Sequence, residues 1–426
     1  MSNRRDFIKK NALAAIYAST IGPFTAFGAS QSKSAKVDFS ALSGDSLWRK
    51  VRAEFPLFKR KVYFNVASLG PASSPTVKEI QSQSVGLAEN GRDGRWLIEE
   101  SREKFAAFLN AKTAEICFCR NATEGMNMVA NVAPLKSGDE VILTDQEHIG
   151  GSAPWLALAK EKGIKVKVVE LDLTGEKVLQ QLKESVSEKT KMISFSHVCC
   201  TTGLVLPAEE IVAFCREKNI MSCVDGAQAL GMFPLDLKSI KPDFYAASGH
   251  KWMFGPIGSG LLYVNQNIIE KCNAGYAGAF SDQHFDLEGK SLKLRQEASR
   301  WEYGTRNSIQ VAAMAASLEM IKNIGIARIQ ARGKELRNSF REKLEKEEAI
   351  TILSPQKEEF ASSIFTFRLD RGGNQEMVEK LRQNGFVCRY IYEADLDAIR
   401  LSFSIMNLKE ELNQFHQELM ALYSAQ

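Results

Sequence analysis

The chain has 426 residues, the length of two or three domains, and its 44% hydrophobic and 25% charged residues exclude wholesale disorder and a collagen-like chain. No long, strongly apolar run follows the N-terminus, which excludes a membrane protein with several spans. The net charge is +4, of which residues 1–28 carry +3 from four basic residues and one acid, so the nearly neutral remainder gives no reason to expect a nucleic-acid partner.

The N-terminus has the order of an export signal. Arg4 and Arg5 precede a mildly apolar stretch from Ala12 to Phe27, and small residues follow it. The paired arginines resemble a twin-arginine signal, which moves folded proteins across a bacterial inner membrane. The alternatives are an amphipathic first helix or a retained anchor. We expect residues 1–30 to be a signal peptide, and the mature protein to be periplasmic without stable membrane insertion.

Short apolar runs alternate with helical patterns between residues 61 and 264. Such alternation predicts an α/β fold, with a mainly parallel sheet between helices and with ligands at the carboxyl ends of its strands. The seven runs are Ile116–Cys119, Val141–Leu143, Val166–Val169, Met192–Val198, Met221–Val224, Phe244–Ala247 and Gly260–Val264.

A helical pattern over Val311–Lys346 leads into a second, smaller α+β region. We expect a large domain over residues 60–310 and a small domain formed by residues 31–59 and 311–426. The elements predicted for the C-terminal region are a strand at Ser363–Arg368, a helix at Gln375–Asn384, strands at Phe386–Ile391 and Ile399–Phe403, and a last helix from Lys409.

The strongest functional signal is an acid and a lysine, each just after an apolar run. Asp225 follows Met221–Val224, and Lys251 follows Phe244–Ala247 by a few residues. An acid and a lysine at neighbouring strand ends suggest pyridoxal 5'-phosphate (PLP). The lysine amine forms a Schiff base with the aldehyde, and the carboxylate pairs with the protonated ring nitrogen.

A phosphate site is predicted where Ile116–Cys119 runs into a polar turn and a helix start. Free N–H groups and the positive end of the helix dipole favour an anion there, with Ala122 and Thr123 as the best donors. His148 follows another strand end, and its flat imidazole can stack on the pyridine ring. Metal ligation is its alternative role, but no second ligand stands at a metal-binding spacing, so no metal is expected.

Together these segments resemble the class V (cysteine desulfurase-like) PLP-dependent aminotransferases of fold type I. The resemblance covers about residues 60–410 and is most specific from Asp225 to Lys251. It implies a large domain on a mainly parallel seven-stranded sheet, a smaller α+β C-terminal domain, PLP as cofactor, and a homodimer with shared active sites.

The resemblance also implies roles for the matching residues. Lys251 is expected to be the Schiff-base lysine and the acid/base for the substrate α-proton, and Asp225 the partner of the ring nitrogen. His148 would stack on the ring. Arg400 would hold the substrate carboxylate, which its planar fork suits, and Asn65 would also contact the substrate. The remaining cofactor contacts would be Ala122, Thr123, Ala227, Gln228, Ser248, His250 and, reaching the partner subunit's phosphate, Gly304 and Thr305.

The sequence departs from the desulfurase pattern near its C-terminus. Desulfurases place a nucleophilic cysteine shortly before the carboxylate-binding arginine, yet residues 389–399 contain no cysteine, and Cys388 lies within an apolar run. The segments Thr201–Pro207 and Glu302–Arg306 look closer to the isopenicillin N epimerase-like branch. That branch includes epimerases and carbon–sulfur lyases.

We therefore expect an exported PLP enzyme that acts at the α-carbon of an amino acid or a related small molecule. A carbon–sulfur lyase or desulfurase-like reaction is the first expectation, transamination the second and epimerisation the third. The alternative from another class is a protein of this fold that binds PLP or an amino acid without turnover. The presence of Lys251, Asp225 and Arg400 argues against it.

Overall fold

The computed structural model describes residues 37–56 and 61–425, so the predicted signal peptide lies outside the described residues. Contacts divide the chain into Met1–Asp38 and Phe39–Gln426, and the second unit contains every sheet described here. The domain boundaries near residues 60 and 310 stay predictions. Within the described ranges, no helix is long and apolar enough to cross a membrane.

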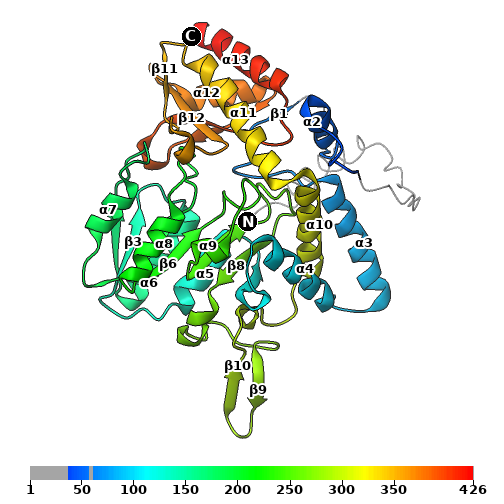
Figure 1. The fold of residues 1–426 in the computed structure, drawn as a ribbon, viewed down its shortest axis with the longest axis vertical. Coiled ribbons are helices and arrows are strands. Elements are labelled where there is room, and N and C mark those ends of the chain that lie inside the picture. Colours follow the sequence, from blue (N-terminus) through cyan, green and yellow to red (C-terminus); the bar gives the residue numbers. More distant parts are fainter. Residues whose placement is uncertain (1–36, 57–60, 426) are drawn as a thin grey trace, which may run out of the picture. The chain divides into compact units, whose positions relative to one another are not determined.

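A seven-stranded sheet, in the order β2-β8-β7-β6-β5-β3-β4, carries the candidate site (Figure 1). Strand β8 runs opposite to the other strands, so the sheet is mainly parallel, as predicted. All seven apolar runs form strands, and β7, an inner strand between β8 and β6, is buried at every position. The strands are β2 (Ile116–Cys119), β3 (Glu140–Thr144), β4 (Lys165–Val169), β5 (Thr190–Ser196), β6 (Met221–Asp225), β7 (Phe244–Ser248) and β8 (Gly260–Val264).

Helices connect these strands and pack against them. Helix α5 contacts β2, β6, β7 and β8, whereas α8 packs on β6 and α7 on β4. Helix α10 packs on α3 and α4. The helices are α3 (Ser74–Asn90), α4 (Arg95–Phe108), α5 (Ala122–Val132), α6 (Ile149–Lys162), α7 (Val178–Ser185), α8 (Ala208–Glu217), α9 (Leu237–Ile240) and α10 (Ser308–Ile324).

The C-terminal region forms a four-stranded sheet in the order β11-β12-β15-β14. Its core joins buried aromatic rings, among them Phe340, Phe365 and Phe403. The elements of this region are α11 (Ile326–Leu344), β11 (Ile350–Ile352), β12 (Ile364–Leu369), α12 (Asn374–Gln383), β14 (Arg389–Ile391), β15 (Ala398–Ser402) and α13 (Lys409–Ser424). Helix α2 (Gly44–Arg52), from the other end of the chain, is linked to α13 by an ion pair between Arg52 and Glu411.

Two predicted elements are each divided in the structure. The helix expected over Val311–Lys346 is two helices, α10 and α11, separated at Gly325, whose φ of +94° lies in the region that favours glycine. The single strand expected over Phe386–Ile391 is likewise observed as two separate strands. Strand β13 (Phe386–Val387) pairs in parallel with β1 (Val62–Tyr63), whereas β14 joins the four-stranded sheet.

A hairpin of β9 (Asp282–Asp286) and β10 (Ser291–Leu294) extends away from the seven-stranded sheet (Figure 1). Phe285 and Leu292 are cross-strand partners on it, and both side chains are exposed. Single exposed apolar residues are ordinary, but an apolar pair on a projecting hairpin marks a candidate contact surface.

Candidate active site

A cavity of about 420 Å³ opens at the carboxyl ends of the parallel strands. It gathers most of the predicted cofactor residues, although they come from segments far apart in the sequence. The residues that line it are Ala67, Ser68, Asn121, Ala122, Thr123, His148, Ser196, Val198, Cys200, Asp225, Ala227, Gln228, Ser248, His250, Lys251 and Arg389. The predicted Asn65, Gly304, Thr305 and Arg400 are not among them.

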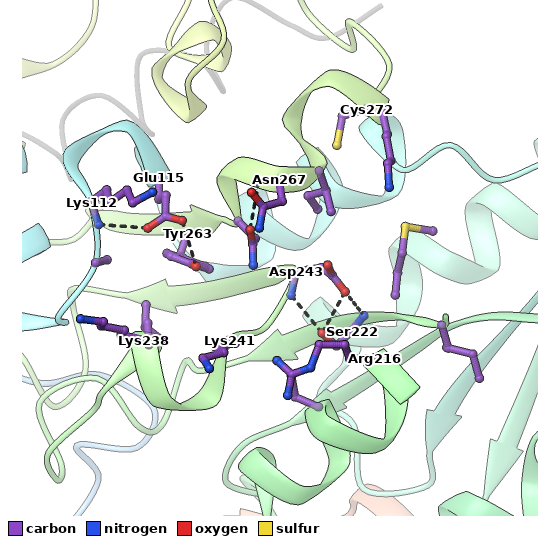
Figure 2. Close-up of a pocket in the computed structure, with 18 of the residues that line it drawn as sticks. Lys112, Glu115, Arg216, Ser222, Lys238, Lys241, Asp243, Tyr263, Asn267 and Cys272 are labelled. Atoms are coloured by element: carbon purple, nitrogen blue, oxygen red, sulfur yellow. Dashed lines mark hydrogen bonds between the residues drawn. The ribbon is translucent and has the colours of Figure 1, made fainter. Parts of the chain in front are cut away.

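A larger cavity, of about 950 Å³, lies at the opposite edge of the same sheet (Figure 2). Its two carboxylates are already occupied: Glu115 accepts hydrogen bonds from Tyr263 Oη and Gln266 N, and Asp243 accepts from Ser222 N. It contains none of the residues predicted to react, and its lysines are exposed. The smaller cavity is therefore the candidate site, because it contains the predicted reactive residues Lys251 and Asp225, although its volume is the lower of the two.

Asp225 is fixed at the carboxyl end of β6. Its Oδ1 accepts a hydrogen bond from Ala227 N at 2.9 Å, and the residue is 6% exposed. A methyl group at Gly151 would lie 3.1 Å from Asp225 Oδ2, so α6 approaches the carboxylate closely. Oδ2 thus borders the cavity as an acceptor, which suits the protonated nitrogen of a pyridine ring.

Lys251 lies in the turn after β7, and its backbone is held by the segment that contains Gly70. Gly70 N donates to His250 O at 2.7 Å, and a methyl group at Gly70 would lie 2.0 Å from Lys251 O. Burial lowers the pKa of Lys251, and the charge of Asp225 partly opposes this. The free amine, which is the nucleophilic and basic form, is thereby favoured.

The N-terminal turn of α5 provides a cradle for an anion. The Asn121 side chain caps this helix by accepting from Glu124 N at 2.8 Å, and Ala122 N donates to Ser248 Oγ at 3.0 Å. His250 Nδ1 is buried and has no hydrogen-bond partner. An orphaned ring nitrogen beside a helix N-terminus fits a phosphate group, which accepts hydrogen bonds from both.

His148 and Gln228 are both fixed by their neighbours. His148 caps α6, since its Nδ1 accepts from Gly150 N at 3.0 Å, and its pKa is lowered, chiefly by burial. Gln228 Nε2 donates to Ala67 O at 2.9 Å, and its Oε1 accepts from Trp252 Nε1 at 2.8 Å. The imidazole is therefore neutral with Nε2 protonated, and Gln228 keeps one amide hydrogen for a ligand.

These residues fit PLP. A buried acid for the ring nitrogen, a lysine with a lowered pKa and an unfilled phosphate cradle border one cavity. Lys251 would hold the aldehyde carbon, Asp225 the ring nitrogen, and Thr123 and His250 the phosphate.

Arg400 lies just behind the cavity wall, in the middle of the four-stranded sheet. It is 0% exposed, and its Nη2 donates to Ser68 Oγ at 2.7 Å and to Asn65 Oδ1 at 3.1 Å. Its Nη1 donates to Cys200 O at 2.8 Å, and its Nε has no partner. Among the described residues no carboxylate pairs with Arg400, so its charge is compensated by neutral acceptors alone.

Two charged residues of the site were not predicted from the sequence. Arg389 lines the cavity, and the pairing that puts it opposite Arg400 depends on strand register, which local patterns do not reveal. Glu147 lies beside Asp225 and accepts from Thr144 Oγ1 at 2.6 Å and from Ser196 Oγ at 2.6 Å. The run of polar residues after β3 is the sequence signal that marks Glu147.

Replacing Glu147 with glutamine should change how stability depends on pH. Burial raises the pKa of Glu147 to about 7, and the charge of Asp225 adds to the increase. A carboxyl pKa raised above its unfolded value means that the folded state holds the proton more tightly. The free energy of unfolding therefore falls as the pH rises from about 4.5 to 7, by up to about 3 kcal/mol, and stays lower above pH 7.

The glutamine variant lacks this ionisation, so it should gain stability relative to the wild type at pH 8 and not at pH 5. Thermal unfolding midpoints of both proteins at the two pH values measure the difference. Exposed Glu188→Gln is the control and should follow the wild type. Equal midpoint differences at pH 5 and pH 8 would show that Glu147 does not titrate abnormally.

Comparison with known proteins agrees with this geometry. A sequence model of the aminotransferase class-V family matches residues 83–415. A probable cysteine desulfurase of Pyrococcus abyssi is 28% identical over 384 residues, which cover 86% of this chain and 95% of that protein. An apo cysteine desulfurase structure from Thermococcus onnurineus NA1 is similar with a TM-score of 0.81 at 25% identity, covering 89% of this chain and 98% of the other.

The cystine C–S lyase C-DES, solved with its reaction product cysteine persulfide, is similar with a TM-score of 0.79 at 28% identity, covering 86% of this chain and 98% of that chain. These neighbours share the fold type I arrangement of a seven-stranded sheet with helices. The family match spans most of the chain, and the lysine, the acid and the phosphate cradle border one cavity. The chain therefore belongs to the aminotransferase class-V family of PLP-dependent enzymes.

Proposed function

We propose that this protein is a PLP-dependent carbon–sulfur lyase that breaks the Cβ–S bond of a cysteine-like amino acid. The observation that carries the proposal is a complete lysine–acid pair beside a cavity that lacks a reactive thiol. Residues 389–399 contain no cysteine, and all eight cysteines are buried and unpaired. The similarity to cysteine desulfurases and to a C–S lyase supports this reaction class.

The thiols near the site are poor nucleophiles. Cys200 lines the cavity, but burial raises its pKa, and burial raises the pKa of Cys388 to about 12. A thiol that stays protonated at neutral pH does not attack sulfur efficiently. Sulfur should therefore leave with the product instead of passing to an enzyme cysteine.

The side chains divide the work between the α-carboxylate and the Cα–H bond of the substrate. PLP, when bound, supplies an electron sink for the charge that develops at Cα. Arg400 binds the α-carboxylate, and Lys251 Nζ removes the Cα proton. The Cα–H electron pair then forms the Cα–Cβ double bond, and the Cβ–S pair leaves with sulfur, which takes up the proton. Hydrolysis by water finally gives pyruvate and ammonium.

The products formed from L-cysteine and L-cystine test this proposal. A lyase releases pyruvate and ammonium in equal amounts, whereas a desulfurase releases alanine and leaves persulfide sulfur on the protein. Cys200→Ser and Cys388→Ser should each retain pyruvate formation. Alanine as the main product, or D-isomers without pyruvate, would overturn the lyase assignment. A keto acid formed together with the pyridoxamine form of the cofactor would instead identify a transaminase.

We infer that the protein is a homodimer whose contact surface includes the β9–β10 hairpin. The exposed apolar pair of Phe285 and Leu292 supports this, as does the resemblance of the segment with Gly304 and Thr305 to one that reaches a partner's phosphate.

The double change F285E and L292E should convert a dimer to a monomer in light scattering, because formation of the dimer would then bury two carboxylates in the contact. Lys293→Glu, on the opposite face of the hairpin, is the control. A protein whose mass is unchanged by the double change would not use this surface.

We also propose export by the twin-arginine route. The support is the order of residues 1–30, with Arg4 and Arg5 first, and it comes from the sequence alone. Replacing both arginines with lysine should hold the protein in the cytoplasm with its signal uncleaved, as shown by cell fractionation. Unchanged periplasmic recovery would point to another route.

A further inference from the structure

The larger cavity, at the other edge of the seven-stranded sheet, is lined by a cluster of basic side chains (Figure 2). They come from the segment before β2, the last turn of α8, the short helix α9 with its C-terminal cap, and the segment after β8. All are exposed, and they are Lys112, Arg216, Lys238, Lys241 and Lys271. Within residues 37–56 and 61–425, none of the five forms an ion pair. Four segments thus bring unneutralised positive charge to one cavity.

This positive charge is a local feature of the molecule. Residues 29–426 carry a net charge of only +1, because +3 of the total of +4 lies in residues 1–28. Lys238 and Lys241 stand three residues apart at the end of α9, and like charges at that spacing repel one another. Binding of an anion relieves such repulsion, so the cluster attracts negatively charged molecules to this cavity.

The first of the two carboxylates that line the cavity is used within the protein. Glu115 is 8% exposed, and both of its oxygens accept hydrogen bonds. Oε1 accepts from Tyr263 Oη and Gln266 N, and Oε2 accepts from Lys112 N at 3.0 Å. Glu115 therefore anchors the surrounding backbone and leaves the cations of the cavity free.

The second carboxylate has one oxygen to spare. Asp243 Oδ2 accepts from Ser222 N at 2.8 Å and from Ser222 Oγ at 3.1 Å, whereas its Oδ1 accepts no hydrogen bond from any residue that the structure describes. Burial raises the pKa of Asp243, and the charges of Lys271 and Arg216 oppose this increase. The free carboxylate oxygen and these two cations therefore share one part of the cavity.

This combination selects for a ligand with two kinds of polar group. Lysine and arginine side chains bind phosphate, the lysines as compact charges and the arginine with its planar fork. A carboxylate oxygen accepts from a hydroxyl group but repels a bare anion, and the cations repel an amine. The volume of about 950 Å³ is within the range of pockets that hold small molecules.

We propose that this cavity binds a small molecule that carries both several phosphate groups and free hydroxyl groups, as a sugar bisphosphate or a nucleoside triphosphate does. Arg216, Lys238 and Lys271 would contact the phosphates, and Asp243 Oδ1 would accept from a hydroxyl. The site has no lining residue in common with the smaller cavity, so the proposal is independent of the cleavage reaction proposed above.

Calorimetry on the PLP-loaded wild type tests this proposal, because PLP then occupies the phosphate cradle of the smaller cavity. The probes are fructose 1,6-bisphosphate, adenosine triphosphate, tripolyphosphate without hydroxyl groups, and adenosine without phosphate. We expect one of the first two to bind at least about 10-fold more tightly than tripolyphosphate and adenosine, as for one charge-assisted hydrogen bond. The better of the two identifies the ligand as a sugar phosphate or a nucleotide. Tripolyphosphate binding as tightly as both, or no binding of any probe, would overturn the proposal.

A pair of charge reversals assigns the binding to this cavity. Arg216→Glu together with Lys238→Glu should weaken the better probe by at least about 10-fold and make its Kd less sensitive to salt. Lys160→Glu together with Lys162→Glu is the matched control, since both lysines are exposed in the last turn of α6, outside the cavity, and the change in charge is the same. The control should keep the Kd of the wild type. An equal loss in both double variants would show that the probe responds to net charge alone, which would refute the site.

Asp243→Asn tests the hydroxyl contact separately. Removing the negative charge should tighten the binding of tripolyphosphate and weaken that of the better probe, so the ratio of their Kd values should approach one. Thermal midpoints establish that each variant is folded. A ratio that stays at its wild-type value in folded Asp243→Asn would show that the carboxylate does not read the ligand.

These outcomes are separate from those of the lyase assignment, because calorimetry measures binding without turnover.

Discussion

Lys251→Ala should abolish turnover and remove the visible absorbance band of the lysine-bound cofactor. Among the described residues that line the cavity, Lys251 is the one lysine, and its lowered pKa favours the basic form. Loss of a positioned general base typically costs 10²- to 10⁴-fold, and losing the covalent link to the cofactor adds to this. Steady-state release of pyruvate and a spectrum of the purified protein measure both effects.

Lys241→Ala is a suitable control because it removes an exposed lysine from the opposite edge of the same sheet. It should retain the activity and the absorbance band of the wild type. Turnover by the Lys251 variant within tenfold of the wild type would refute the assignment of the catalytic lysine. A wild type without an absorbance band after incubation with PLP would refute the cofactor assignment itself.

Gly70→Ala should have the second largest effect, although the residue takes no part in the chemistry. The added methyl group would lie 2.0 Å from Lys251 O and 2.9 Å from Lys251 C, which are backbone atoms that cannot rotate away. The Lys251 turn must therefore shift. We expect a loss of about 1–3 kcal/mol in the free energy of unfolding, as for an overpacked core. A displacement near 1 Å should lower kcat/KM by about 10²-fold.

Gly86→Ala is the matched change, since a methyl group there meets nothing within 4 Å and Gly86 lies inside α3. It should retain activity and gain up to about 1 kcal/mol, because alanine favours the helix more than glycine does. Urea unfolding and kcat/KM compare the two variants. Wild-type activity in Gly70→Ala would mean that the Lys251 turn is free to move.

The sequence was sufficient to predict the sheet and several of the residues that gather at its strand ends. Apolar runs specify buried strands directly, and Asp225 and Lys251 follow their strands within a few residues, so local order was enough to bring them together. The same holds for Thr123 and His250 at the phosphate cradle. The roles taken from the family resemblance stay predictions, because the cavity shows position and not occupancy.

What the sequence did not reveal depends on register and on backbone conformation. The meeting of Arg389 with Arg400 requires the β14–β15 pairing, in which a shift by one residue would turn either side chain to the other face. The division of strand Phe386–Ile391 depends on the pairing of β13 with β1, which is far away in the sequence. The helix break at Gly325 depends on the positive φ that this glycine adopts. A local pattern cannot distinguish these arrangements from continuous elements.

The segment from Asn65 to Gly70 joins the two halves of the site, and this has a consequence for the order of assembly. Gly70 N bonds to His250 O, whereas Asn65 Oδ1 bonds to Arg400, 335 residues away in the sequence. The cofactor half needs the chain as far as β8, which lies between β2 and β7 in the sheet, whereas the carboxylate half also needs β15, much later in the sequence. During synthesis the protein should therefore acquire affinity for PLP before affinity for an amino acid. The export proposed above, which moves folded proteins, would then follow cofactor binding, and the cofactor would be in place before the substrate site closes.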